Sequence, residues 1–214
     1  MRKCSLLIAG LLAAFVGFAQ PQIYLNGFAG YSFDESVYVE GYSGKIKGGM
    51  HYGGSVELAI PRASTRFNER TVEITYQTMS TEMRGYLLLA PKTYDINIHY
   101  LTLGGNNYFG QNRKAMAFGG AAIGAVWSTN KNNSQSVTKF AFNVKGGGRF
   151  MLADNVGLKL YAQLNSAVGG IGGGFYFGTG GTGAGISTYS TFLQFGLGGG
   201  LTIGLGGSKP STRK

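Results

Sequence analysis

The chain has 214 residues, of which 38 are glycine, 27 are tyrosine or phenylalanine, and only 13% are charged. Average proteins carry about twice that share of charge. The one cysteine, Cys4, lies at the start, so the rest of the chain can form no disulfide bond. Beyond residues 1–19, no segment reaches the roughly 18 unbroken apolar residues of a membrane helix, so this part of the chain is either soluble or spans a membrane as a β-barrel.

Residues 1–19 show the three-part pattern of a secretory signal peptide. A positive start is followed by an apolar run and by small residues at the cleavage position. The apolar run is too short for a spanning helix, although a membrane anchor is the alternative interpretation. We therefore expect export, with residues 20–207 forming one domain and residues 208–214 a short basic tail.

Eight segments alternate in side-chain character with period two, which indicates β-strands. They lie near residues 22–33, 50–60, 69–79, 93–103, 114–128, 138–150, 156–166 and 189–205. In the second segment Met50, Tyr52 and Val56 share one face, and His51 and Glu57 share the other. The fifth segment is almost entirely small or apolar, so the pattern leaves its facing open.

The connections between these segments alternate long and short. The long ones are 34–49, 80–92, 128–137 and 168–188, and the shorter ones include a Gly/Asn-rich turn region at 104–113. The apolar patch 86–89 either extends a strand or caps a loop. Barrels of the bacterial outer membrane make tight turns on the inner side and long loops on the outer side. The sequence therefore predicts an all-β fold, an eight-stranded antiparallel up-and-down transmembrane β-barrel.

The alternation also predicts which side chains face lipid and which face the lumen. We expect an inward-facing polar network of His51, Glu57, Glu73, Asp95, His99, Lys139, Lys145, Arg149 and Lys159. The lumen of an eight-stranded barrel is barely wide enough for its own side chains, and buried charges need partners. We expect ion pairs that plug the lumen, with a narrow ion path as the alternative. Interfacial aromatic girdles are expected from Tyr31, Phe33, Tyr52, Tyr94, Tyr100, Phe140 and Phe150.

Signals for chemistry are weak. His51, Ser55 and Glu57 share a face, as in enzymes that edit lipid A, but their spacing matches no known motif. The Gly-rich run 169–185 lacks the Gly-Lys-Ser/Thr ending of a phosphate-binding loop. The two histidines are far apart and show no metal-ligand spacing. We expect no catalytic residue, no metal and no cofactor.

Three segments carry a resemblance to a known group of proteins: 100–109, 117–124 and 142–158. With them the mature chain resembles the small outer-membrane β-barrel family, the porin-like group that includes the OmpA membrane domain and OmpX. The resemblance implies this fold and a place in the bacterial outer membrane. One feature departs from the family: the last strand ends near Leu205 and a basic tail follows, where family members commonly end on an aromatic residue.

Together these patterns predict a non-enzymatic, monomeric protein that serves envelope integrity or surface interaction through its long loops. The net charge of +10 suggests the phosphates of lipopolysaccharide as a partner, or simply solvated loop and tail charges. Outer-membrane lipid and an extracellular or envelope protein are the other expected partners, and export argues against nucleic acid. The alternatives are a lipid-modifying enzyme, a narrow small-solute channel, and a secreted soluble barrel that binds an apolar ligand.

Overall fold

The computed structural model describes residues 22–39, 42–61, 68–87, 90–130, 136–168, 175–177, 184–186 and 192–205. The predicted signal peptide and basic tail lie outside the described residues, as does most of the connection 168–188. Within the described residues, no helix is long and apolar enough to span a membrane.

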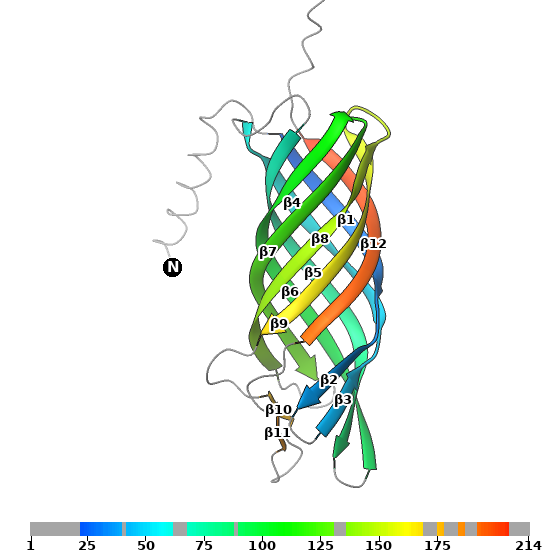
Figure 1. Cartoon of the computed structure of the whole chain (residues 1–214), viewed down its shortest axis with the longest axis vertical. Coiled ribbons are helices and arrows are strands. Elements are labelled where there is room, and N and C mark those ends of the chain that lie inside the picture. The colour runs from blue at the N-terminus through cyan, green and yellow to red at the C-terminus, as the bar shows by residue number, and fades with distance from the viewer. Residues whose placement is uncertain are drawn as a thin grey trace, which may run out of the picture.

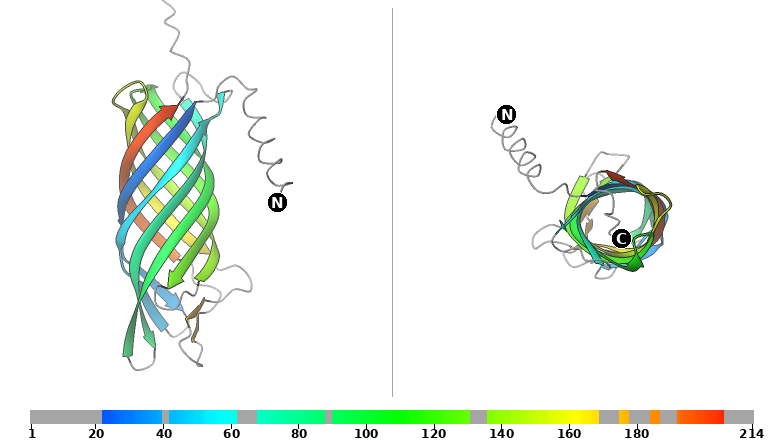
Figure 2. Two further views of the ribbon diagram at one scale, coloured as in Figure 1. Left: turned by 180° about the vertical axis from the view of Figure 1, so that it is seen from behind. Right: turned by 90° about the horizontal axis from the view of Figure 1, so that it is seen from above.

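Eight antiparallel strands close into a barrel (Figure 1). They are β1 (Ile23–Ser32), β4 (Gly49–Ala59), β5 (Asn68–Leu87), β6 (Ala90–Asn112), β7 (Ala115–Asn130), β8 (Ser136–Met151), β9 (Val156–Val168) and β12 (Phe192–Leu205). Each barrel strand pairs with the next one along the chain, and β1 pairs with β12 to close the ring. The view along the axis in Figure 2 shows this closed ring. The predicted eight-stranded antiparallel barrel is confirmed.

The two ends of the barrel differ in their connections (Figure 1). At one end, which we call the turn end, lie Ile60 and Pro61 after β4, the links 113–114 and 152–155, the start of β1 and the end of β12. The opposite end, the hairpin end, carries β2 (Glu35–Val39), β3 (Tyr42–Ile46), β10 (Phe175–Phe177) and β11 (Ala184–Ile186). The short links 113–114 and 152–155 therefore lie at the opposite end of the barrel from the additional strands β2, β3, β10 and β11.

The segment 80–92 is not the loop that the sequence predicts. β5 and β6 stay paired without a break from Asn68 opposite Phe109 to Leu87 opposite Ala90, so the hairpin rises beyond the barrel rim. The predicted loop 34–49 is likewise largely a hairpin, because β2 pairs with β3 and β3 pairs with the outer part of β5. In these ladders, backbone N–H and C=O groups form hydrogen bonds between strands. An isolated two-stranded hairpin would instead leave the groups along its edges to bond with solvent.

The predicted turn region 104–113 is also wrong, because β6 continues through it to Asn112. Its inward side chains hold it in the wall: Asn106 donates to Glu73 at 2.8 Å and Tyr108 donates to Glu57 at 2.7 Å. The true turn is only two residues long. The side-chain oxygen of Asn112 accepts two backbone N–H groups there, which stabilises a tight turn.

The outer wall is apolar, which inverts the arrangement of a soluble protein. Exposed large apolar side chains come from all eight barrel strands, among them Leu25, Val56, Ile74, Leu103, Ile123, Val144, Leu160, Leu197, Leu201 and Ile203. β7, whose facing the sequence left open, turns Met116, Phe118 and Val126 inward and Ile123 outward. Such a belt suits lipid and would be a large exposed patch in water.

Candidate functional site

Buried inward-facing side chains fill the lumen in three layers. An ionic layer lies near the turn end, a layer of amides and His51 lies in the middle, and an apolar layer lies near the hairpin end. These layers decide whether the barrel can act as a channel, a catalyst or a scaffold.

The ionic layer begins with Arg149, which is 2% exposed. Its guanidinium lies 3.1 Å from Glu69 and sits over two rings, 3.9 Å from the centroid of Tyr108 and 4.7 Å from that of Tyr24. Tyr24 also donates to Glu69 at 3.2 Å. A cation between two aromatic faces and a carboxylate is held by both charge and cation–π attraction.

Glu57 is the centre of the ionic layer. It pairs with Lys159 and accepts hydrogen bonds from Tyr108 at 2.7 Å and from Thr71 and Asn26 at 2.9 Å. These donors satisfy both of its buried carboxylate oxygens, as a buried charge requires.

Glu73 pairs with Lys145 and lies 3.9 Å from Lys159. Three carboxylates, Glu57, Glu69 and Glu73, thus meet three cations, Lys145, Arg149 and Lys159. The layer therefore contains equal numbers of opposite charges, and each charge is paired with one of opposite sign.

Glu69 was missed at the sequence level, although the signal was present. Glu69 has the same strand parity as Glu73, and alternate residues of a strand share a face. Arg149 needed a buried partner, and Glu69 is the carboxylate that meets it from 80 positions away in the chain. Strand parity alone identified the inward face but did not assign this pair.

His51 is fully buried in the middle layer. Its Nδ1 lies 3.0 Å from the Ser32 hydroxyl and its Nε2 lies 3.1 Å from the Tyr161 hydroxyl. The Tyr161 ring comes close to Gly198, where an added Cβ would lie 2.5 Å from the phenol. Glycine at this position of β12, directly opposite Tyr161 in the β9–β12 ladder, leaves room for the tyrosine ring to lie over the strand.

The predicted grouping of His51, Ser55 and Glu57 does not form a hydrogen-bonded triad. The three share the inward face, but the Ser55 hydroxyl accepts a hydrogen bond from Asn26 at 2.9 Å, and Glu57 pairs with Lys159 in the ionic layer. Among the described residues, no group of three or more His, Cys, Asp or Glu side chains is placed to hold a metal ion.

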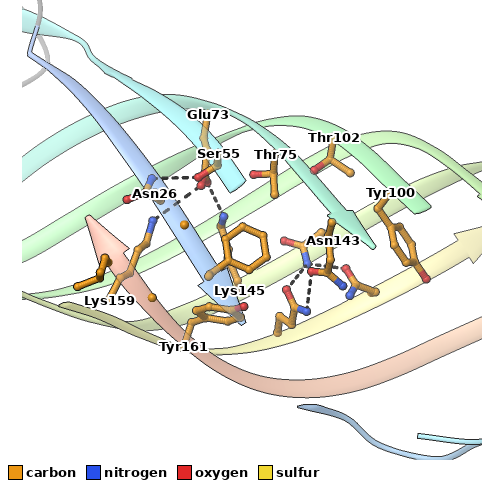
Figure 3. Close-up of a pocket in the computed structure, with 17 residues that line it drawn as sticks. Asn26, Ser55, Glu73, Thr75, Tyr100, Thr102, Asn143, Lys145, Lys159 and Tyr161 are labelled. Atoms are coloured by element: carbon orange, nitrogen blue, oxygen red, sulfur yellow. Dashed lines mark hydrogen bonds and ion pairs between the residues drawn. The ribbon is translucent and has the colours of Figure 1, made fainter. Parts of the chain in front are cut away.

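A small cavity lies between the ionic and apolar layers (Figure 3). Its volume is about 30 Å³, enough for roughly two water molecules. Asn143 and Asn165 face it, joined by a 2.7 Å hydrogen bond, and Lys145, Glu73 and Tyr100 are among the other lining residues. A space of this size does not form a continuous aqueous path.

The apolar layer reverses the predicted facing of β6. Ile96, Ile98 and Tyr100, expected outside, are 2–4% exposed and pack inside with Met79 and Val126. The alternation is therefore real, but its apolar side faces inward near the hairpin end. The pattern distinguishes two faces of a strand and does not say which one meets the lumen.

Two members of the predicted inward network consequently lie outside the barrel. Asp95 is exposed, and His99 packs on the outer wall against Trp127 with ring centroids 5.5 Å apart. Lys139 has inward parity and is half-buried near the apolar layer. The other six predicted residues, His51, Glu57, Glu73, Lys145, Arg149 and Lys159, all lie in the lumen.

The aromatic girdle differs from the prediction in one described member, Tyr100, which lies in the lumen. Tyr31, Phe33, Tyr52, Phe140 and Phe150 are exposed on the outer wall, whereas the Tyr94 side chain lies outside the described part.

Comparison with known proteins identifies the fold. Neither a family model nor a curated protein matches the sequence. Among solved structures, Neisserial surface protein A (NspA) matches with a TM-score of 0.53 and 13% identity, covering 85% of this chain and 96% of that one. The outer membrane protein OprG from Pseudomonas aeruginosa matches with a TM-score of 0.51 and 11% identity, covering 87% and 97%. The chain has the fold of small outer-membrane β-barrels.

Proposed function

We propose that this chain is an integral, monomeric protein of a bacterial outer membrane with a plugged lumen and a non-enzymatic role. It would serve envelope integrity or surface interaction through the hairpin end, which faces the cell exterior. Outer-membrane lipid, lipopolysaccharide and an extracellular or envelope protein are its proposed partners. The observation that carries the proposal is the inverted wall, with apolar side chains outside and paired charges inside.

The inverted wall supports membrane integration on energetic grounds. Shifting the pairing of a strand by one residue would point the side chain of Glu57 or Lys159 toward the lipid hydrocarbon. It would also bring leucine and valine side chains into the lumen. Charges on the lipid face of a barrel cost about 2–4 kcal/mol each at the midplane. A soluble barrel would instead expose the whole apolar belt to water, so the secreted, soluble alternative is disfavoured.

The first test concerns integration. Membranes containing the protein are washed with alkaline carbonate and then with high salt, and the pellet and supernatant are analysed on gels with and without heating. We expect the chain to stay in the pellet and to migrate differently before and after heating, because the closed barrel resists unfolding in cold detergent. Release into the supernatant would contradict the proposal.

The second test concerns the plug. In planar bilayers we expect the purified protein to give no stable single-channel steps, because the ionic and apolar layers close the lumen on both sides of the small cavity. The competing function, a narrow small-solute channel, predicts reproducible steps whose size depends on the electrolyte. Such steps would refute the plug while leaving membrane integration intact.

A further inference from the structure

Three aromatic side chains from neighbouring strands meet on the outer wall; we call Tyr76, His99 and Trp127 the aromatic row. The His99 ring stacks near Trp127 and near Tyr76, with centroids 5.5 Å and 6.1 Å apart. The Tyr76 hydroxyl lies 2.9 Å from His99 Nδ1. Trp127 is the one tryptophan of the chain. Tryptophan and tyrosine gather where hydrocarbon meets the polar head groups.

The row divides the outer face of β5 and β6 into two zones. Toward the turn end the exposed side chains are apolar, as at Ile74 and Leu103. Toward the hairpin end they become polar: Ser80 donates to Asn97 at 2.7 Å, and the next outward position on β6 is Asp95. The row therefore marks the outer boundary of the hydrocarbon.

Beyond the row, the described side chains on the outer face of β3, β5 and β6 are polar, and we call this part of the three strands the blade. Lys45 lies opposite Arg84 in the β3–β5 ladder, and both are exposed. Lys45 pairs with Asp34 and Lys47 pairs with Glu82, each at 2.7 Å. Those lysine hydrogen bonds lower the pKa of both carboxyl groups, so the blade carries both signs of charge at neutral pH.

The height of the blade indicates which part of the surrounding lipid lies beside it. Eight residue pairs extend from Ser80 opposite Asn97 to Leu87 opposite Ala90. At about 3.4 Å per residue they span roughly 25 Å along the strand, or about 19 Å above the row at a usual barrel tilt. A phospholipid head-group layer is only about 5–8 Å deep. Most of the blade thus stands above any phospholipid, at the level that sugars occupy in a lipid with a saccharide head group.

We propose that the aromatic row and the blade together form a docking surface for the saccharide head group of lipopolysaccharide. This inference rests on the proposed outer-membrane location. The chemistry fits sugars: aromatic rings offer apolar contact to the C–H faces of a sugar ring. Asn97, Ser80 and Asp95 beside them offer donors and acceptors to its hydroxyl groups. The face continues directly from the lipid-facing wall, so a lipid anchored beside β5 and β6 would carry its own sugars past these residues.

Trp127 makes this proposal measurable, because its fluorescence reports on the row. The mature protein is inserted into phosphatidylcholine vesicles that contain either lipopolysaccharide with its core sugars, the lipid A part alone, or neither. We expect a saturable change in Trp127 emission with the complete lipopolysaccharide and a much smaller one with lipid A. Equal responses to both would place the contact on the lipid A part and not on the core sugars, and would overturn the proposal.

A pair of variants sharpens the test. Replacing Asn97 with leucine and Ser80 with alanine removes the hydrogen-bonding groups and keeps Trp127, and we expect about tenfold weaker binding of the complete lipopolysaccharide. Arg70→Gln, an exposed change at the turn end, is the control and should bind as the unaltered chain does. Unchanged affinity in the double variant would contradict the docking surface.

Heat-dependent gel migration of the same vesicles verifies insertion for every protein. Failure to insert would refute the proposed location, whereas insertion without a response to sugars would refute only the docking surface.

Discussion

Replacing Arg149 with methionine is expected to destabilise the barrel by about 3–5 kcal/mol, because Glu69 would remain buried without its cation. Glu69 is 5% exposed, and its remaining hydrogen bond comes from Tyr24 at 3.2 Å. The variant also loses the contacts of the guanidinium with two tyrosine rings. Urea unfolding of protein refolded into phospholipid vesicles, followed by Trp127 fluorescence, measures the change.

Two further variants separate charge from packing. Arg149→Met combined with Glu69→Gln removes both charges, and we expect it to recover most of the lost stability, since buried ion pairs replaced as a unit are often neutral. Lys47→Met breaks a partly exposed ion pair outside the lumen and should destabilise the barrel far less than Arg149→Met does. If the double variant were as unstable as Arg149→Met alone, the ring contacts and not the ion pair would hold this layer.

The second large effect is expected at Ile98. Replacing it with lysine places an unpaired cation in the apolar layer, against Met79 and Val126 and in a lumen that already contains the inward-facing Lys139. We expect a loss of about 3–5 kcal/mol or failure to fold, because an uncompensated buried charge is costly. The same urea titration and heat-dependent gel migration report the outcome.

The neighbouring position is the matched control. Asn97→Lys puts the same charge one residue earlier, on the outer face above the aromatic row. There we expect a loss of folding stability of less than about 0.5 kcal/mol. If Ile98→Lys fails to fold, Ile98→Ala gives a measurable substitute with an expected loss of about 2–5 kcal/mol. A reversed order, with Asn97→Lys the more harmful, would mean that β6 faces as the sequence pattern predicted.

The facing of most strands could be predicted because a single strand carries the necessary information. In β4, β8 and β9, charged residues such as Glu57, Lys145 and Lys159 alternate with apolar ones at the level of the hydrocarbon. There the side that carries charge must face inward, so period two and the cost of a charge in lipid together assign both faces.

The same reasoning fails on β6 because, at the proposed position in the membrane, this strand extends beyond the hydrocarbon. Near Asp95 and His99 the outside is polar, and apolar side chains gain most by packing inside against Met79 and Val126. The residues alternate as before, but the rule that assigns the faces no longer applies. For the same reason the sequence pattern predicted a loop where β5 and β6 form an extended hairpin, because the polar outer residues of the hairpin resemble those of a connecting loop.

The sequence by itself determined the number of barrel strands, their alternation and the inward face of seven of the nine predicted polar residues. Only the tertiary structure decided that Arg149 meets Glu69, that His51 binds Ser32 and Tyr161, and that β6 faces the other way. The physical reason is the separation in sequence of the residues that interact. Alternation is a property of neighbouring residues on one strand, whereas side-chain pairing inside the barrel depends on how eight strands tilt and close, which brings together groups up to 176 positions apart.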